Sequence, residues 1–172
     1  RFPDVKGLRP TADRVRETLF NWLQASLPGA ACLDLFAGSG ALGLEAISRG
    51  AAALVCCEQS AAAARNLQEN IRLLGLQDRA VVKRMDARRL LQQSPGQLFD
   101  IVFVDPPFAA GLLSQICLQL EQSECLAPNA YIYLEQDSSH PWPDLPSNWL
   151  LLRETTAGQA VCRLFQRAII AS

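Results

Sequence analysis

Apolar residues occur in short continuous runs that alternate with stretches in which they recur every three or four positions. Runs of four to six apolar residues predict buried strands, and the wider spacing predicts helices that bury one face. The runs predict strands at residues 31–36, 53–57, 80–83, 99–104 and 130–135. The wider spacing predicts helices at about residues 42–48, 61–74, 87–92 and 112–121. An earlier helix, capped by Thr11 or Asp13 and ended by Pro28-Gly29, should carry Val15, Leu19, Trp22 and Leu23.

The pattern changes near the carboxyl end, after a proline-rich stretch at residues 140–146. Residues 149–154 and 160–166 have the pattern of two strands joined by a turn at Ala157-Gly158-Gln159. No helix fits between them, so they should pair antiparallel. We expect one Rossmann-like α/β domain over residues 1–172, with a mostly parallel seven-stranded sheet, an antiparallel carboxyl-terminal hairpin and helices on both faces. Residues 1–28 should form a basic segment and helix, and residues 29–172 the core that carries the site.

The composition is that of a globular protein, since 49% of the 172 residues are hydrophobic and 19% are charged. No apolar run approaches the roughly 18 residues of a membrane span, and we see no secretory leader, so we expect a cytoplasmic protein without a membrane partner. The six cysteines include no C-x-x-C pair, and His140 is the single histidine. We therefore expect neither a disulfide framework nor a metal site. The chain begins at Arg1 rather than methionine, and we expect it to be part of a longer protein.

The small net charge of −1 hides two basic clusters. Residues 1–16 hold five basic and two acidic side chains, and residues 79–89 hold five basic and one acidic. Most of these bases are arginine, whose planar guanidinium suits phosphate groups. Ordinary solvated helix faces would explain the clusters equally well, but the clusters also permit a nucleic-acid partner. The arginines expected to contact RNA are Arg9, Arg14, Arg84, Arg88 and Arg89.

A glycine-rich turn, Asp34-Leu-Phe-Ala-Gly38-Ser-Gly40-Ala-Leu-Gly43, joins the first predicted strand of the sheet to the next helix. Open α/β sheets bind ligands at such junctions. The three glycines match G-x-G-x-x-G, and Glu58 lies twenty residues after Gly38, where a ribose-binding acid is expected. A nicotinamide-dependent oxidoreductase is therefore a real alternative, although no hydride-site histidine or Tyr-x-x-x-Lys is evident.

Asp34 favours a different ligand. It lies four residues before Gly38, where its charge would repel the pyrophosphate of a dinucleotide. S-adenosylmethionine has no phosphate and carries an ammonium and a sulfonium, so the same carboxylate should attract it. After the third strand, Asp86 could accept a hydrogen bond from the adenine amino group, and the amide of Ala87 could donate to a ring nitrogen. A helix cap explains Asp86 equally well.

The fourth predicted strand leads directly into Asp105-Pro106-Pro107-Phe108, beside the glycine turn. The prolines remove backbone donors and stiffen the loop, so it presents acceptors only. Asp105 and the Pro106 carbonyl could accept the two hydrogens of an exocyclic amine on a base and aim its lone pair at the sulfonium methyl. Phe108 could stack on a flipped-out base. The segment thus indicates methylation of a nucleic-acid amine.

These motifs together resemble the amino-methyltransferases that share an [Asn/Asp]-Pro-Pro-aromatic motif. Three further segments are similar to the bacterial 16S ribosomal RNA (guanine-N2)-methyltransferase family of the small subunit methyltransferase D type: Gly7-Leu-Arg-Pro-Thr11, Asp13-Arg-Val-Arg-Glu17 and Leu19-Phe20-Asn21-Trp22. The resemblance extends over nearly the whole chain, through Arg163-Leu-Phe-Gln166. It implies S-adenosylmethionine-dependent methylation of the N2 amine of a guanine in 16S ribosomal RNA, either free or in the small subunit. Family members usually carry a basic stretch before the first of these segments, whereas only residues 1–6 precede it here.

The expected site has two sets of residues besides the arginines. The catalytic set is Asp105, Pro106 and Phe108. The cofactor set is Asp34, Phe36, Gly38, Ser39, Gly40, Glu58, Gln59, Asp86 and Ala87. The residues alone leave open adenine N6 or DNA as the target, and also a non-catalytic RNA-binding domain, which the intact motifs disfavour. We expect a monomer.

Overall fold

The structure, a computed structural model, describes residues 10–93, 96–107 and 111–168. Predicted Phe108 and Arg9 lie outside these ranges. The helices are α1 (Pro10–Leu23), α2 (Ala41–Ser48), α3 (Ala61–Leu73), α4 (Ala87–Gln92) and α5 (Leu112–Gln122). The strands are β1 (Ala31–Asp34), β2 (Ala53–Cys57), β3 (Ala80–Lys83), β4 (Phe99–Val104), β5 (Leu126–Asp137), β6 (Trp149–Ala157) and β7 (Ala160–Arg167).

One seven-stranded sheet with the strand order β3-β2-β1-β4-β5-β7-β6 organises the described residues. The first five strands run parallel, and β7 lies antiparallel between β5 and β6. This confirms the predicted fold class, including the hairpin. The order reverses at β1, and in such sheets the crevice at the carboxyl ends of the strands beside the reversal is the ligand site.

Several predicted boundaries were wrong. The helix α1 ends at Leu23, before Pro28-Gly29, and the last three strands extend one to three residues beyond their predicted ends. The helix α1 begins at Pro10, so Thr11 and Asp13 lie in its first turn and neither is its cap; proline favours the first helical position because its amide is not needed there. The strand β1 ends at Asp34 rather than Phe36, since the chain already turns toward the glycines. The strand β5 begins four residues before Ala130, at Leu126.

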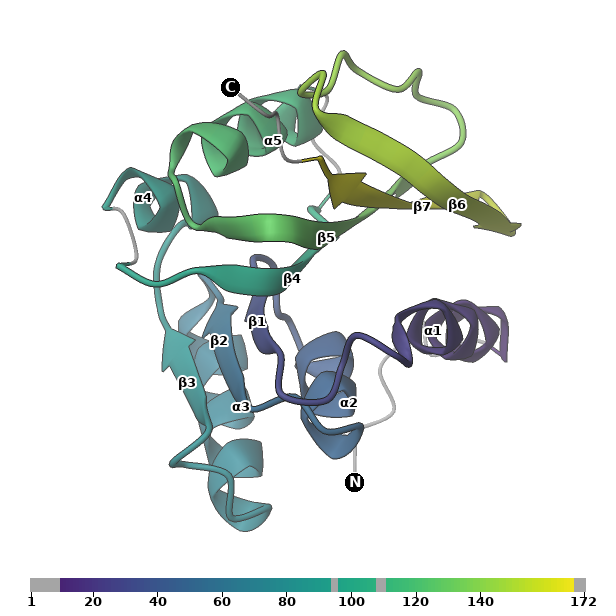
Figure 1. Ribbon diagram of the computed structural model, residues 1–172. Coiled ribbons are helices and arrows are strands. Elements are labelled where there is room, and N and C mark those ends of the chain that lie inside the picture. The colour runs from purple at the N-terminus through teal and green to yellow at the C-terminus, as the bar shows by residue number, and fades with distance from the viewer. Residues whose placement is uncertain (1–9, 94–95, 108–110, 169–172) are drawn as a thin grey trace.

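Helices cover both faces of the sheet (Figure 1). The helices α4 and α5 pack on one face, where Leu90, Ile116 and Leu120 join a core with Val102 and Ile132. The helices α1, α2 and α3 pack on the other face. There the core includes Leu19, Phe20, Leu67, Phe103 and Tyr133. Each helix buries only one side, as the sequence spacing predicts.

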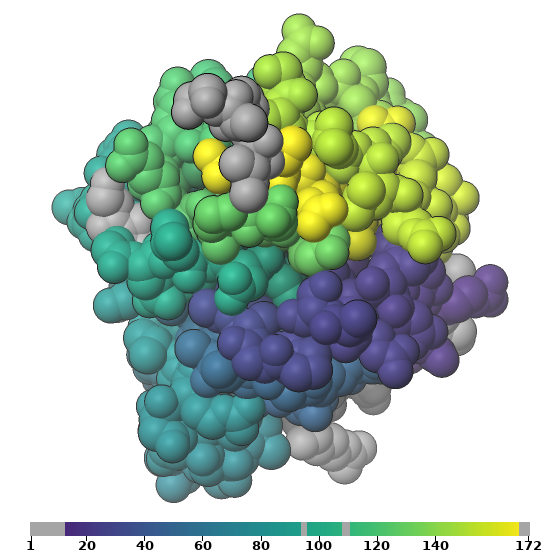
Figure 2. Space-filling model, in the orientation of Figure 1, coloured from purple at the N-terminus to yellow at the C-terminus, as the bar shows by residue number. Residues whose placement is uncertain are grey.

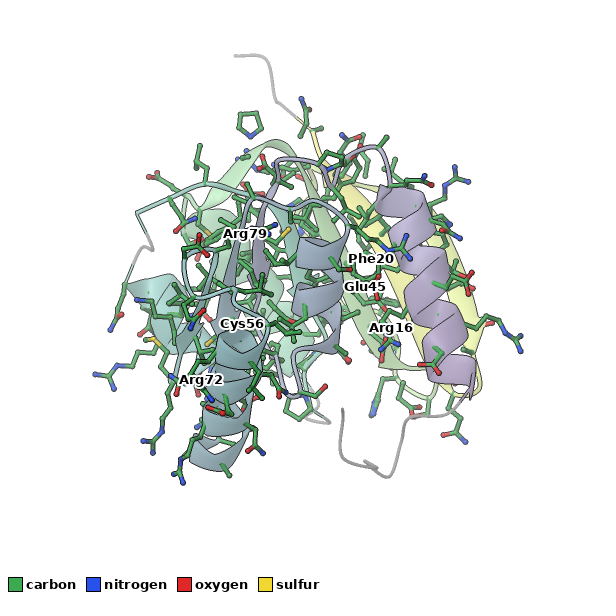
Figure 3. All side chains as sticks on the ribbon, turned by 90° about the horizontal axis from the view of Figure 1, so that it is seen from below. Arg16, Phe20, Glu45, Cys56, Arg72 and Arg79 are labelled. Carbon is green, nitrogen blue, oxygen red and sulfur yellow. The ribbon has the colours of Figure 1, made fainter. Side chains whose placement is uncertain are left out.

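The first helix lies against the last strands of the sheet (Figure 2). It reaches them because Phe20 and Leu23 are fully buried against the sheet core. Phe20 also packs on Phe103, with ring centroids 5.8 Å apart, and points into the body of the molecule (Figure 3). The helix α1 is therefore part of the folded domain.

A carboxylate clamp joins α5 to the end of the hairpin. Glu121 accepts hydrogen bonds from Arg167 at 2.8 Å, from the indole of Trp149 at 2.8 Å and from Asn148 at 3.3 Å. Burial opposes ionisation of Glu121, but these donors outweigh it and hold the pKa of the carboxyl below its ordinary value. The clamp fixes the antiparallel edge against the helical layer.

Candidate active site

A pocket of about 1510 Å³ opens at the carboxyl edge of the parallel strands. Segments that follow β1, β2, β3 and β4 line one side of it, and the end of β5 and the β6–β7 turn line the other. Typical small-ligand pockets occupy about 300–1,000 Å³, so this one has room for more than one ligand. The pocket joins the glycine turn to the Asp105 segment, as the sequence predicts.

The glycine turn depends on left-handed backbone at two positions. Gly38 has φ +54° and Gly40 has φ +84°, a region that side chains rarely adopt. A Cβ on Gly38 would meet nothing within 4 Å, and Gly38 lines the pocket, so a ligand can approach its backbone closely. A Cβ on Gly40 would lie 2.3 Å from Leu67 Cδ1. Gly40 thus serves packing, and neither it nor the exposed Ser39 lines the pocket.

Asp34 lies beneath the turn rather than in the pocket. It is 2% exposed, and it accepts backbone hydrogen bonds from Phe36 and Gly43. Burial is the main cause that raises the pKa of Asp34 to about 7, against the effect of those two amides. The predicted direct contact with a cofactor does not follow from this position, since the side chain holds the turn together from below. Phe36, in contrast, lines the pocket.

Glu58 links the end of β2 to the glycine turn. Its Oε1 accepts from the Gly38 amide at 2.9 Å, and its Oε2 accepts from the Ser60 amide at 2.7 Å. An ionised carboxylate offers about four acceptor positions, so capacity remains for hydroxyl groups of a ligand. Glu58 and Gln59 both line the pocket, and their contact with a cofactor stays a prediction.

Asp86 caps α4, and both explanations of this residue fit the structure. Its Oδ1 accepts from the Arg88 amide at 2.8 Å, while it also lines the pocket together with Ala87. The Arg88 guanidinium lies 2.9 Å from Asp86 Oδ2, and this contact holds the pKa of Asp86 below its usual range. Arg88 is therefore paired within the pocket, which sets it apart from the other arginines predicted to bind RNA.

The Asp105 segment forms the floor between the two sides of the pocket. Asp105 and Pro106 line it directly after β4. The side chain of Asp105 is exposed to the pocket space. Enclosure by the pocket walls, followed by the charges of Glu135 and Asp34, raises the pKa of Asp105 well above its ordinary value. The role predicted for Phe108 lies outside the described residues.

Sequence reasoning missed three contributors to the pocket. Glu135 enters from the end of β5, and Tyr133 donates a hydrogen bond to its Oε1 at 2.6 Å. Arg16 lies on α1 (Figure 3). It lines the pocket, and its guanidinium lies 3.1 Å from the Asp13 carboxylate. His140 also lines it, from the loop between β5 and β6. Alternation along residues 130–135 could have indicated that Tyr133 and Glu135 share a face, but not which strand they lie beside.

The described arginines of the two predicted basic clusters lie on different elements of the fold. Arg14 is exposed on α1, while Arg84 and Arg89 are exposed where β3 leads into α4. The helices α1 and α4 pack on different sides of the sheet, and each contributes one arginine, Arg16 and Arg88, to the pocket lining.

Within the described ranges, no group of three or more His, Cys, Asp or Glu residues could hold a metal ion, and all six cysteines are free and buried. Burial raises the pKa of the Cys57 thiol to about 12, so it stays protonated beside the pocket. No helix in the described part of the chain is both long and apolar enough to cross a membrane.

Comparison with known proteins agrees with this arrangement. The family described as Conserved hypothetical protein 95 matches residues 1–166. The Ribosomal RNA small subunit methyltransferase D of Escherichia coli is 49% identical over 165 residues, which cover 96% of this chain and 82% of the relative. A solved putative methyltransferase from Escherichia coli has a TM-score of 0.89 at 44% identity and covers 98% of this chain and 92% of its own. A putative methylase from Haemophilus influenzae has a TM-score of 0.84 at 41% identity, with 93% and 100% covered. The chain belongs to the ribosomal RNA small subunit methyltransferase D family.

Proposed function

We propose that this protein transfers a methyl group from S-adenosylmethionine to the exocyclic N2 amine of a guanine in small-subunit ribosomal RNA. The observation that carries the proposal is the Asp105-Pro106 segment, placed in one pocket with the glycine turn and Glu58. The names of the relatives support methylation of ribosomal RNA. They give no support to a nicotinamide-dependent oxidoreductase. We keep the cytoplasmic location and the monomeric state as predictions.

The pocket suits a cationic cofactor that carries an adenosine. Five acidic residues line it: Glu58, Asp86, Asp105, Glu135 and Asp137. The two arginines that line it, Arg16 and Arg88, are each paired with an aspartate, Asp13 and Asp86, and no lysine occurs among the described lining residues. Glu58 would accept from the ribose hydroxyls, Asp86 and Ala87 would bind the adenine, and Gly38 would let the ligand approach the turn. When bound, S-adenosylmethionine supplies an electrophilic methyl group on a positively charged sulfur.

Asp105 and Pro106 would act on the amine. The lone pair of the guanine N2 amine is delocalised into the ring, which makes the nitrogen a poor nucleophile. Two acceptors on its hydrogens, the Asp105 carboxylate and the Pro106 carbonyl, would turn the lone pair out of the ring plane. The charge of Asp105 becomes more favourable as the nitrogen gains positive charge. Most of the catalysis is thus positioning and electrostatics.

The direct test is transfer of a tritiated methyl group to naked 16S RNA and to small-subunit particles, followed by nucleoside analysis. We expect N2-methylguanosine as the product. Asp105→Asn keeps the shape but loses the charge, so single-turnover transfer should slow, and Asp105→Ala should lose about 10²–10³-fold. Cofactor affinity, measured by calorimetry, serves as the control and should persist in both variants. A different methylated nucleoside, or transfer by Asp105→Ala near the wild-type rate, would overturn the proposal.

A further inference from the structure

Two acidic side chains lie next to each other on the floor of the pocket. The strands β4 and β5 pair in parallel with Val104 opposite Leu134. Asp105 directly follows β4, and Glu135 is the next residue of β5, so the register places these two side by side at the carboxyl edge of the sheet. Both line the pocket.

Glu135 is held from below by a buried phenol. Tyr133 is 1% exposed, lies two residues before Glu135 on the same face of β5, and donates its hydroxyl to Glu135 Oε1 at 2.6 Å. The thiol of Cys162, opposite Glu135 in the register of β7, lies 3.6 Å from the same oxygen. One oxygen of the carboxylate is therefore anchored by its own strand and the next, and Oε2 has no donor among the described residues.

The pair offers hydrogen-bond acceptors without a matching cation. Burial, and then the charge of Glu135, raises the pKa of Asp105. No ion pair to either residue occurs in the described part of the chain. The free acceptor oxygens of such a pair are best satisfied by a ligand that presents several N–H donors in a row.

Guanine is the base with that edge. It presents N1–H beside the two hydrogens of its 2-amino group, which makes three adjacent donors. Adenine and cytosine each place a ring-nitrogen acceptor next to the exocyclic amine, and that acceptor would face a carboxylate oxygen. This complementarity involves only the edge of the base, because the two carboxylates need no contact with ribose or phosphate to recognise it.

We propose that Glu135, anchored by Tyr133, accepts the N1–H of the target guanine and thereby selects guanine over other bases, while Asp105 and the Pro106 carbonyl accept from the 2-amino group. This inference rests on the proposed function and deepens it. Glu135 acts as a specificity-determining residue beside the reacting amine. The Tyr133 hydroxyl is a positioning group, because it reaches the base only through Glu135.

The test replaces the target guanine by 2-aminopurine, which keeps the 2-amino group but has an acceptor at ring position N1. The target nucleotide is first mapped with the wild-type protein, and 16S RNA carrying either base there is made by ligation and assembled into particles. In single turnover we expect the wild-type protein to prefer guanine by at least about 10²-fold, as for a site that hydrogen-bonds a group its competitor lacks. Glu135→Gln should reduce this preference to within about tenfold, because its amide can turn and donate to N1.

Asp144→Asn is the matched control. It removes one exposed carboxylate outside the pocket and should leave the preference unchanged. Tyr133→Phe removes only the anchoring hydroxyl and should weaken the preference for guanine while leaving cofactor affinity intact. If Glu135→Gln does not fold, the wild-type preference and Tyr133→Phe still decide.

The outcomes separate this inference from the function on which it rests. If the wild-type protein forms no N2-methylguanosine, the proposed function fails. If it methylates guanine and 2-aminopurine equally well, or if Glu135→Gln slows both substrates by the same factor, the role of Glu135 is refuted and the methyltransferase proposal remains.

Discussion

Within the glycine turn, Gly40 is the residue whose substitution should destabilise the protein most. Gly40→Ala adds a single methyl group at the start of α2. This methyl meets two separate obstacles, since the backbone there is left-handed, at φ +84°, and Leu67 Cδ1 lies 2.3 Å from the ideal Cβ position. Leu67 belongs to α3 and is 1% exposed in the core, so it can give way only by repacking.

The two costs can be estimated separately. An alanine in the left-handed region costs about 1–2 kcal/mol. Forcing an extra methyl into a packed core costs about 1–3 kcal/mol. We therefore expect Gly40→Ala to lower the free energy of unfolding by about 2–5 kcal/mol. A Cβ also restricts the unfolded chain, but this effect is common to every Gly→Ala change and cancels in comparison.

Two other glycines serve as matched controls. Gly75 has φ +69° with nothing within 4 Å, so Gly75→Ala measures only the backbone cost, about 1–2 kcal/mol. In α2, a Cβ on Gly43 would lie 2.8 Å from Leu54 Cδ2 without a positive φ. Its clash is partly offset by a gain of about 1 kcal/mol in helix propensity, so Gly43→Ala should cost about 0–2 kcal/mol.

Equilibrium unfolding in urea gives the three values directly, with unchanged m-values confirming that the native state stays compact. Gly40→Ala should be the most destabilising of the three, and its cost should approach the sum of backbone strain and clash. If Gly40→Ala loses no more free energy of unfolding than Gly75→Ala, then Leu67 repacks without a measurable penalty. The contact of Gly40 with Leu67 would then not help to position Gly38.

Three further results are expected. Glu58→Ala should weaken S-adenosylmethionine binding by about 1–3 kcal/mol in calorimetry, and unchanged affinity would show that the ribose lies elsewhere. Glu121→Gln should cost about 1–3 kcal/mol at pH 7. The pKa of Glu121 is lowered in the folded state, so its stabilisation of the fold is fully present above about pH 4.3 and is lost as the pH falls through the lower folded value. Between pH 7 and pH 3, the free energy of unfolding should therefore fall less in the variant than in the wild type. Replacing Arg84 and Arg89 by Gln should reduce the salt dependence of RNA binding by about one to two units of slope, whereas the same change at the two arginines of α3 should not. An equal effect of the two pairs would make the first an ordinary solvated face.

Local patterns in the sequence were sufficient to predict most elements and the location of the site. Strand and helix periods depend on neighbouring residues, so β2, β3 and β4 have their predicted bounds. The glycine turn and the Asp105-Pro106-Pro107 loop are likewise defined by residues that are adjacent in the sequence. Both follow parallel strands whose carboxyl ends lie at the same edge of the sheet. The sequence therefore predicted where the pocket lies, but not all of the residues that line it.

Contacts between distant segments were decided only by the tertiary structure. Asp34 was assigned to ligand contact from its charge, but the fold buries it under the turn, where backbone amides take its oxygens. Glu135 was overlooked because its neighbour Asp105 is thirty residues away, and the order and register of β4 and β5 bring them together. Residue spacing specifies which way a side chain faces on its own strand. Which strand lies beside it depends on how the whole sheet buries its two faces, and that is a property of the complete chain.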